Sequence, residues 1–510
     1  MNPKQPIDAA ASSIADIQNF KGKYPKQIWP LFFSEMWERF CFYGMRGMLV
    51  FFMINHLSME EAQANLQYGA TQAFVYAFTF IGGLFADKLL GYRKSLFWGG
   101  ILMIFGSVIL AIDPNAYFFY GISFTIIGTG FFKPNISTMV GALYKDGDER
   151  TDAGFSLFYA GINLGALIGG YVCIAVGKGT MLQSIIPQQY SWNFAFGFAA
   201  VVMVISLITF IFTQRQMGPI GLSPLLHLDA SKRRNLEIAT YVGSLLVIPG
   251  IMTLVSVPQY TDLFMFIIGP ATLLYLIYEM SQLDAVTNKR LLAAMVFIVF
   301  SIFFWAFFEQ SGGSLSIFAA DHLSNQVVGF NLDSNGVNNS ANSFFVILLA
   351  APLGLVWIWM SNRKSEPNTL IKFGLGFIAL AAGFYLFSYN RMFSNADGVT
   401  SLDVFTLAWL MITIGELCLS PIGMSVMTKL APAKLQAVMM GMWFLASAYG
   451  QYFAGILGAN IAEASDDASP LQKLNIYCDG YAQLGLYALI CGGVLIAISP
   501  FVRKLMAGVK

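Results

Sequence analysis

Long apolar stretches alternate with short polar segments along the whole 510-residue chain. A helix needs about 20 residues to cross the hydrocarbon core of a bilayer, and most of these stretches reach that length. The pattern predicts fourteen membrane-spanning helices, at residues 26–55, 64–87, 94–112, 117–143, 152–176, 192–215, 237–256, 260–280, 291–320, 341–361, 369–388, 403–430, 435–460 and 480–508. The chain is therefore expected to be an all-α, polytopic membrane protein.

The composition supports a membrane protein. Hydrophobic residues make up 56% of the chain and charged residues 11%, against about 25% charged in a typical soluble protein. The mean hydropathy of +0.63 excludes a soluble multidomain protein. The net charge of +1 gives no indication of a nucleic-acid partner. The expected surroundings are a lipid bilayer, and the protein is expected to work as a monomer.

Lysine and arginine residues test the helix count, because cytoplasmic loops of membrane proteins are enriched in both. With the N-terminus in the cytoplasm, 23 of the 29 basic residues fall on the cytoplasmic side and three on the far side. The remaining three, Arg39, Arg46 and Lys133, lie inside predicted helices. One missed or extra helix would exchange the two sides of the membrane for every later loop and would remove this bias. The bias therefore supports the helix count, and it predicts that both termini are cytoplasmic.

Residues 216–290 divide the chain. They begin with the Gly- and Pro-bearing, then basic, segment GPIGLSPLLHLDASKRRN, which is typical of a cytoplasmic linker. The next two apolar stretches contain almost no polar residue and predict an inserted hairpin outside any transport pathway. The predicted domains are a cytoplasmic tail at 1–25, a six-helix bundle at 26–215, the linker with the inserted pair at 216–290, and a second six-helix bundle at 291–510. Two six-helix halves are typical of transporters that bind substrate between them near the midplane.

The first apolar stretch contains SEMWERFCFYGMRG, with four charged residues: Glu35, Glu38, Arg39 and Arg46. Each would cost about 2.5–3.5 kcal/mol at the bilayer centre if it were unpaired. Spacings of three and four place them, with Phe42 and Tyr43, along one helix face. We expect that face to lie in a protein interior or a wet cavity, and Phe33, Trp37, Phe40 and Phe51 to face lipid. The structural alternative is an ion-pair cluster that only fixes the helix register.

Four further polar residues lie inside predicted helices: Lys133, Asn163, Glu309 and Glu416. Together with the first stretch, they bring three positive and four negative charges into the membrane interior. One carboxyl group is therefore in excess, and removal from water favours its protonated form, as a proton carrier requires. Cationic and anionic groups together suit a zwitterionic substrate. The structural alternative is an ion pair between Lys133 and Glu416 that only bridges the two bundles.

The predicted loop after the second helix reads GGLFADKLLGYRKS. It contains the pattern G-x-x-x-D-x-x-G-x-R-K, and we predict that Asp87, Arg93 and Lys94 form a latch that holds one conformational state. The five cysteines and three histidines show no metal-ligand spacing. No HExxH or GxSxG motif is present, and no enzyme activity or metal site is expected.

Several of these motifs resemble a known family. EMWERFCFYG at 35–44, GGLFADKLLG, GFFKPN, FYAGINLG, FFEQSGGSL, GELCLSP and GMWFLASAYG resemble the motifs of bacterial proton-dependent oligopeptide transporters, the POT/PTR family of the major facilitator superfamily. The resemblance implies the major facilitator fold and a multi-pass protein of the bacterial inner (plasma) membrane. It also implies import of di- and tripeptides by alternating access, with protons as the coupling ion and no other cofactor.

The resemblance also implies roles for single residues. Proton coupling is expected at Glu35, Glu38, Arg39 and Glu309, and Arg46 resembles the partner of Glu309. Arg39, Tyr43 and Lys133 match positions that bind the peptide carboxylate, and Arg46 is also expected among the substrate-binding residues. Asn163, Asn342 and Glu416 match positions that bind its amine. Side-chain pockets are expected at Tyr76, Tyr159, Trp305, Ser420 and Trp443.

Two departures from the family pattern affect these expectations. Phe42 stands where many members have a second tyrosine, and Gly69 occupies the position of the histidine that is essential in animal members. A histidine relay is therefore not expected, and the carboxylates would carry the protons. The alternatives are a transporter of another small zwitterion or anion, such as nitrate, and a peptide sensor that does not transport.

Overall fold

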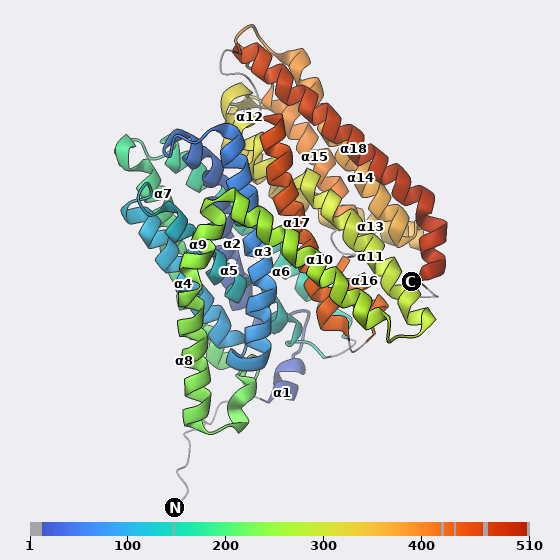
Figure 1. Ribbon diagram of the computed structural model, residues 1–510. Helices are drawn as coiled ribbons and strands as arrows, with labels where there is room; N and C mark the ends of the chain where they lie inside the picture. The colour runs from blue at the N-terminus through green and yellow to red at the C-terminus, as the bar shows by residue number, and fades with distance from the viewer. Residues whose placement is uncertain (1–12, 146–147, 420–422, 433–434, 463–467, 507–510) are drawn as a thin grey trace, which may run out of the picture. The chain divides into compact units, whose positions relative to one another are not determined.

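The computed structural model describes residues 13–145, 148–419, 423–432, 435–462 and 468–506 (Figure 1). Eleven helices in these ranges are long and apolar enough to cross a membrane. Every one of the fourteen predicted stretches overlaps a helix, but the number of spans stays a prediction. α2 (Ile28–Asn55) is not among the eleven, because its four charged residues leave no sufficiently uncharged window.

The chain forms two compact units. Unit 1 comprises Met1–Met45, Phe78–Gly169 and Leu182–Met252. The helices that lie wholly in unit 1 are α1 (Ile14–Gln18), α4 (Tyr92–Ile112), α5 (Phe118–Gly141), α7 (Ser191–Gln214) and α8 (Ala230–Leu246). Small residues allow α4 and α5 to approach closely. A Cβ atom on Gly128, for example, would lie 2.7 Å from the carbonyl oxygen of Gly99.

Unit 2 comprises Arg46–Ala77, Gly170–Met181 and Thr253–Lys510. Its helices are α10 (Pro258–Met280), α11 (Ala285–Phe308), α12 (Ser314–His322), α13 (Ser334–Asn362), α14 (Thr369–Tyr389), α15 (Leu402–Leu419), α16 (Gly423–Leu430), α17 (Gln436–Ile461) and α18 (Pro470–Leu505). A two-stranded antiparallel hairpin, β1 (Gln326–Val327) with β2 (Phe330–Asn331), precedes α13. Helix α14 packs between α15 and α18 (Figure 1).

Four helices pass from one unit to the other. They are α2, α3 (Glu61–Phe85), α6 (Arg150–Gly177) and α9 (Ile248–Ser256). Parts of the first three therefore pack with the second half of the chain, and in unit 2 Gly69 of α3 lies directly against Gly455 of α17. The compact units thus follow a different division from the predicted six-helix bundles, whose boundaries stay a prediction.

One stretch that was expected to be a continuous helix is interrupted. The stretch 291–320 contains α11, a 3₁₀ turn at Glu309–Gly312 (η5), and α12. Gly312 and Gly313 weaken the helix there, because glycine in a helix interior is disfavoured by about 1 kcal/mol relative to alanine.

The expected lipid-facing side of α2 is wrong at one position. Phe33 is exposed, at 43%, whereas Phe40 is only 6% exposed. Gly169 of α6 lies against the backbone of Phe40, and no side chain of α6 holds the two helices apart at this point. The close approach of α6 therefore covers a face that the hydrophobic pattern assigned to lipid.

The linker and the first inserted helix are attached to unit 1. Arg93 donates from Nε to the carbonyl oxygen of Ile220 at 2.6 Å and from Nη2 to the carbonyl oxygen of Gly218. Lys94 forms an ion pair with Glu237 of α8 at 2.6 Å. Two residues of the predicted latch, Arg93 and Lys94, thus bind the linker and α8.

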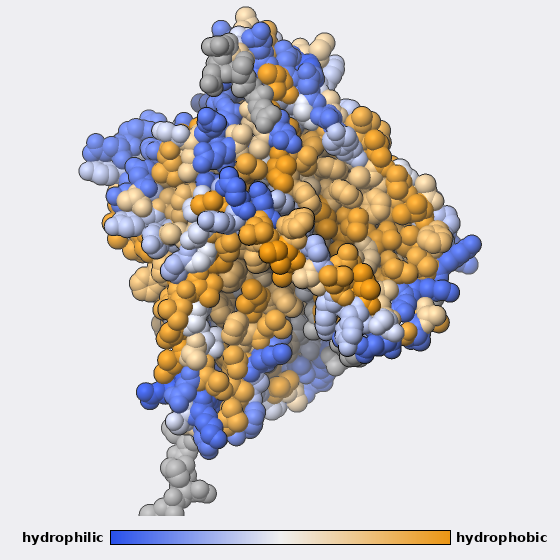
Figure 2. Space-filling view, in the orientation of Figure 1, coloured by the Kyte–Doolittle hydropathy of each residue, from blue (hydrophilic) through white to orange (hydrophobic). Residues whose placement is uncertain are grey.

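The second inserted helix is attached to unit 2. In α10, Asp262 accepts a hydrogen bond from the hydroxyl of Tyr452 at 2.6 Å, and the carbonyl oxygen of Met265 accepts one from Tyr449. Hydrophobic residues extend along the outer surfaces of α8 and α10, and hydrophilic residues gather where α8 begins (Figure 2). Highly exposed apolar side chains such as Leu246 and Phe266 fit a lipid environment.

A partly buried ion pair stabilises the start of α13. Asp333 caps the helix by accepting from the backbone N–H of Gly336 at 2.8 Å, and it also pairs with Lys178 at 2.9 Å. We expect Asp333→Ala to cost about 3–5 kcal/mol for the uncompensated partner charge and about 1 kcal/mol for the cap. Asp333→Asn keeps the cap and should lose less. Thermal unfolding in detergent checks this, and equal midpoints for the wild type and both variants would contradict it.

Candidate functional site

The charged face of α2 forms a buried cluster in unit 1. Nε of Arg39 lies 2.8 Å from Glu35 Oε1 and 2.6 Å from Glu38 Oε2, and the three side chains are at most 3% exposed. The i, i+4 spacing of Glu35 and Arg39 on one helix allows this pairing. Removing one partner from such a cluster would leave a buried charge uncompensated, so its charges are strongly coupled.

Phe42 lies close to both basic groups of unit 1. Its ring centroid is 5.5 Å from the Arg39 guanidinium carbon and 5.9 Å from the Lys133 ammonium nitrogen. Both distances fall within the roughly 6 Å range of cation–π attraction. A ring without a hydroxyl group therefore stabilises two cations at this position.

Lys133 and Asn163 come from neighbouring helices of unit 1. Lys133 lies on α5, which continues through Pro134 without interruption, and its side chain is half-buried. Asn163 lies on α6 and donates from Nδ2 to the carbonyl oxygen of Tyr159 at 2.9 Å. Tyr43 packs edge-on against Phe42, with 5.3 Å between the ring centroids. Unit 1 thus places Arg39, Lys133 and Tyr43 around the ring of Phe42.

The second cluster lies in unit 2 around Arg46. Its guanidinium forms an ion pair with Glu309, donates from Nη2 to Ser311 Oγ at 2.9 Å, and donates from Nε to Tyr68 Oη at 2.7 Å. Glu309 is 3% exposed and Arg46 is 8% exposed. Because both charges are removed from water, each depends strongly on the charge state of the other.

The η5 turn that carries Glu309 is fixed by its buried neighbour Gln310. The amide nitrogen of Gln310 donates to the carbonyl oxygens of Ala306 at 3.2 Å and Ala454 at 3.0 Å, and its oxygen accepts from Ser314 at 2.7 Å. These bonds hold the turn where the α-helical hydrogen bonds end. Glu309 therefore lies on a 3₁₀ turn that is held by hydrogen bonds, and not on a regular α-helix.

Glu416 and Asn342 form the third polar group, also in unit 2. Nδ2 of Asn342 lies 2.7 Å from Glu416 Oε2 and 3.2 Å from Thr413 Oγ1. Glu416 is 8% exposed. A carboxylate beside a side-chain amide offers acceptor atoms for an ammonium group, which carries only donors.

Comparison with known proteins identifies the family. The model of the POT family matches residues 93–474. The chain belongs to the POT family. It is 32% identical to peptide transporter YePEPT of Yersinia enterocolitica, over 95% of each chain. It is 31% identical to a di-/tripeptide transporter of Lactococcus lactis subsp. cremoris, over 95% of this chain and 97% of the relative.

A solved structure of peptide transporter POT in complex with sulfate covers 98% of this chain and all of its own, at 30% identity and a TM-score of 0.79. The likeness confirms the expected fold class, that of a helical transporter like the major facilitator proteins. This POT-family chain is a multi-pass membrane protein. The resemblance that the sequence motifs indicated is confirmed as well.

The remaining predicted residues of this POT-family chain lie in several places. Tyr76, Trp305 and Trp443 belong to unit 2, where Trp305 packs edge-on against Phe308 with 5.3 Å between centroids. Ser420 lies outside the described residues. The roles of these residues in substrate binding stay predictions. So does the latch of Asp87, Arg93 and Lys94, of which Arg93 and Lys94 bind the linker and α8.

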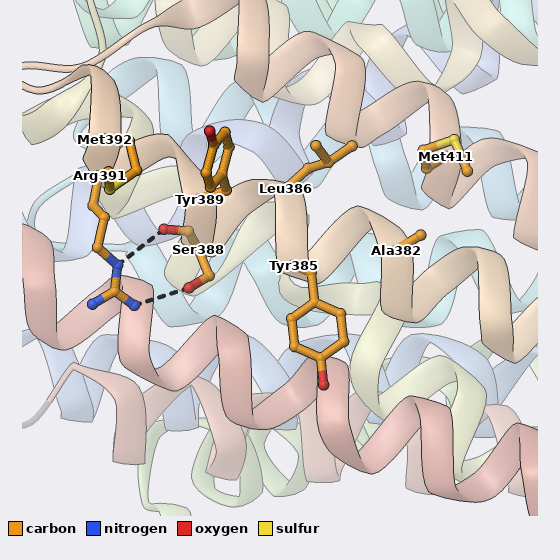
Figure 3. Close-up of a pocket in the computed structure, with 8 residues that line it drawn as sticks. All are labelled: Ala382, Tyr385, Leu386, Ser388, Tyr389, Arg391, Met392 and Met411. Atoms are coloured by element: carbon orange, nitrogen blue, oxygen red, sulfur yellow. Dashed lines mark hydrogen bonds between the residues drawn. The ribbon is translucent and has the colours of Figure 1, made fainter.

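A pocket of about 670 Å³ lies elsewhere in unit 2, lined by α14, the 3₁₀ turn η6 (Asn390–Phe393) and α15. Arg391 at its rim donates to the carbonyl and hydroxyl oxygens of Ser388 (Figure 3). The lining contains none of the predicted site residues of this POT-family chain. Among the described residues there is also no group of three His, Cys, Asp or Glu side chains that could bind a metal ion.

Sequence reasoning missed Tyr68 and Ser311, which contact Arg46. Tyr68 is 22 residues from Arg46 in sequence, and no motif links it to the charged positions. Ser311 lies within the FFEQSGGSL motif, two residues after Glu309, and its hydroxyl was not singled out. Only Ser311 could have been predicted from the sequence, because hydroxyl groups near a buried charge commonly serve as its hydrogen-bond partners.

Proposed function

We propose that this protein is a proton-coupled symporter that imports di- and tripeptides by alternating access. The observation that carries the proposal is the buried ion pair between Arg46 and Glu309. A proton on Glu309 removes one charge of the pair and weakens its attraction for Arg46. Proton binding can thus change which contacts hold the protein in one state, as coupling requires.

The chemistry of the two units supports a zwitterionic substrate. In the proposal, Arg39 and Lys133 of unit 1 bind the peptide carboxylate, because a guanidinium and an ammonium group both offer N–H donors and no acceptors. Glu416 and Asn342 of unit 2 bind the peptide amine. The two relatives named above are called a peptide transporter and a di-/tripeptide transporter, which favours peptides over nitrate or another small ion.

The membrane setting is also part of the proposal. The distribution of lysine and arginine supports cytoplasmic N- and C-termini, and the bacterial relatives support the inner (plasma) membrane. We propose a monomer as the functional form, with the proton as the coupling ion.

The experiment uses purified protein in liposomes with an acidic exterior. Uptake of labelled dialanine is followed with and without an uncoupler. Concentrative uptake that the uncoupler abolishes supports symport. Uptake that only reaches equilibrium would leave a facilitator, saturable binding without uptake would favour a peptide sensor, and inhibition by nitrate but not by peptides would favour an anion transporter.

Glu416→Gln should weaken binding of the peptide amine. A hydrogen bond to a charged group contributes about 1.5–3 kcal/mol, so KM for dialanine should rise by about ten-fold or more. KM for N-acetylated dialanine, which has no ammonium group, should change little. Glu279→Gln is a matched control, since it removes another buried carboxylate, which accepts from Tyr275 at 3.2 Å. Equal losses for both substrates would contradict the assignment.

A further inference from the structure

The ion pair around Arg46 contains two uncharged acceptors that the proposed coupling step does not use. Tyr68 Oη accepts from Nε at 2.7 Å, and Ser311 Oγ accepts from Nη2 at 2.9 Å. The described contacts of the guanidinium thus include one carboxylate and two hydroxyl groups. Only the carboxylate changes its charge when a proton arrives, because both hydroxyl groups stay neutral.

Both hydroxyl groups are held in place by their surroundings. Tyr68 is 1% exposed, and its ring lies so close to Gly312 that a Cβ atom there would be 2.6 Å from the ring carbon Cε2. The backbone of Ser311 is fixed by Asn338, whose Nδ2 donates to the Ser311 carbonyl oxygen at 2.7 Å. Tyr68 on α3 is thus packed against the same turn that carries Glu309 and Ser311.

We propose that Tyr68, assisted by Ser311, is a positioning residue that keeps Arg46 at the η5 turn when Glu309 takes up its proton. The inference rests on the proposed proton coupling. A buried guanidinium without partners would be strongly destabilised. Two neutral acceptors lower that cost, and they matter most when the carboxylate charge is gone. They therefore hold Arg46 in both charge states of its carboxylate partner.

Among the described residues, the neighbouring elements bring acidic and neutral groups toward Glu309. Glu416 on α15 interacts electrostatically with both Glu309 and Arg46, and it is acidic, so it offers no second cation. α13 presents the neutral Asn338, and α17 presents the carbonyl oxygen of Ala454 to the turn. α12 carries Asp321 and His322 at its opposite end, about two turns away.

The test is the pH dependence of dialanine uptake by Tyr68→Phe in liposomes. The variant keeps the ring against Gly312 and removes one acceptor of Arg46. The pH at which uptake is half-maximal should move about one pH unit to the acid side. The hydrogen bond between Arg46 and Tyr68, which this variant loses, contributes more when Glu309 is protonated. Ser311→Ala should move the midpoint in the same direction by a smaller amount, and it tests the same idea should Tyr68→Phe not fold.

A matched control separates this effect from the loss of any buried tyrosine hydroxyl. The hydroxyl of Tyr477 donates to Glu61 at 2.6 Å, so Tyr477→Phe removes a comparable bond without touching Arg46. Its midpoint should stay at the wild-type value. Unchanged midpoints for both Tyr68→Phe and Ser311→Ala, with an active wild type, would overturn the inference. Loss of proton dependence in the wild type itself would instead overturn the proposed function.

Discussion

Glu309→Gln should abolish concentrative peptide uptake and leave exchange of labelled for unlabelled peptide intact. Glutamine keeps a hydrogen-bond acceptor for Arg46 but cannot gain or lose a proton, so no proton moves with the substrate. One proton driven by 100 mV supplies about 2.3 kcal/mol, enough for about 50-fold accumulation. The internal-to-external ratio of dialanine should therefore fall from a value of that order to one.

The measurement compares the accumulation ratio with the rate of counterflow in the same liposomes. Glu366→Gln is the control, because Glu366 has its own basic partner, Lys372, but lies in the loop before α14. The hydrogen bond from Lys372 lowers the pKa of Glu366, so this carboxylate stays ionised from pH 5 to 8. Surface pairs contribute little to stability, and uptake should be normal. Accumulation by Glu309→Gln equal to wild type would assign the coupling proton to another carboxylate.

Gly69→Ala should reduce transport by about ten-fold or more through the packing of α3 on α17. A Cβ atom at this position would lie 2.7 Å from Gly455 Cα and 3.0 Å from the carbonyl oxygen of Gln451. Both neighbours are backbone atoms, so the two helices must move apart. Overpacking of this kind costs typically 1–3 kcal/mol, which disfavours the described state by about 5- to 150-fold.

The matched control is Gly493→Ala on α18, because no atom lies within 4 Å of a Cβ atom there. That variant should transport like the wild type. Initial rates of dialanine uptake at saturating substrate give the comparison, with thermal unfolding to show that both variants fold. A normal rate for Gly69→Ala would mean that the contact with Gly455 is not needed during transport.

The same contact leaves no space for a histidine at position 69, where a histidine relay was not expected. The family pattern places histidine at the Gly69 position in animal members, and the sequence alone showed only the substitution. In the structure, the adjacent backbone of α17 leaves no room for any side chain at Gly69. The neighbouring Tyr68 instead contributes a hydroxyl group to Arg46.

The sequence predicted local features of the charged face well and contacts between distant segments poorly. The pairing of Arg39 with Glu35 follows from helical spacing and from the cost of a bare charge in the membrane, so it needs no tertiary information. The partners of Arg46 on α3 and η5 depend on how helices pack. The 3₁₀ turn at Glu309 was also missed, because its apolar flanks look like one continuous helix.

The ion pair between Lys178 and Asp333 is another contact between distant segments that the sequence did not predict. Charge counting placed Lys178 on the far side of the membrane, where it looked like an ordinary loop residue. In the structure it pairs with a helix cap 155 residues away, and Asp333 is only 8% exposed. Hydrophobic periodicity carries no information on such a pair, because neither residue lies within an apolar stretch.

The two inserted helices are attached to different units. α8 is bound to unit 1 through Lys94 and α10 to unit 2 through Tyr452. The chain crosses from one unit to the other at Met252–Thr253, inside the nine-residue helix α9, and it also crosses within α2, α3 and α6. The inserted pair is therefore one of several covalent connections between the units. A chain cut within α9 would still be joined across the units by α2, α3 and α6.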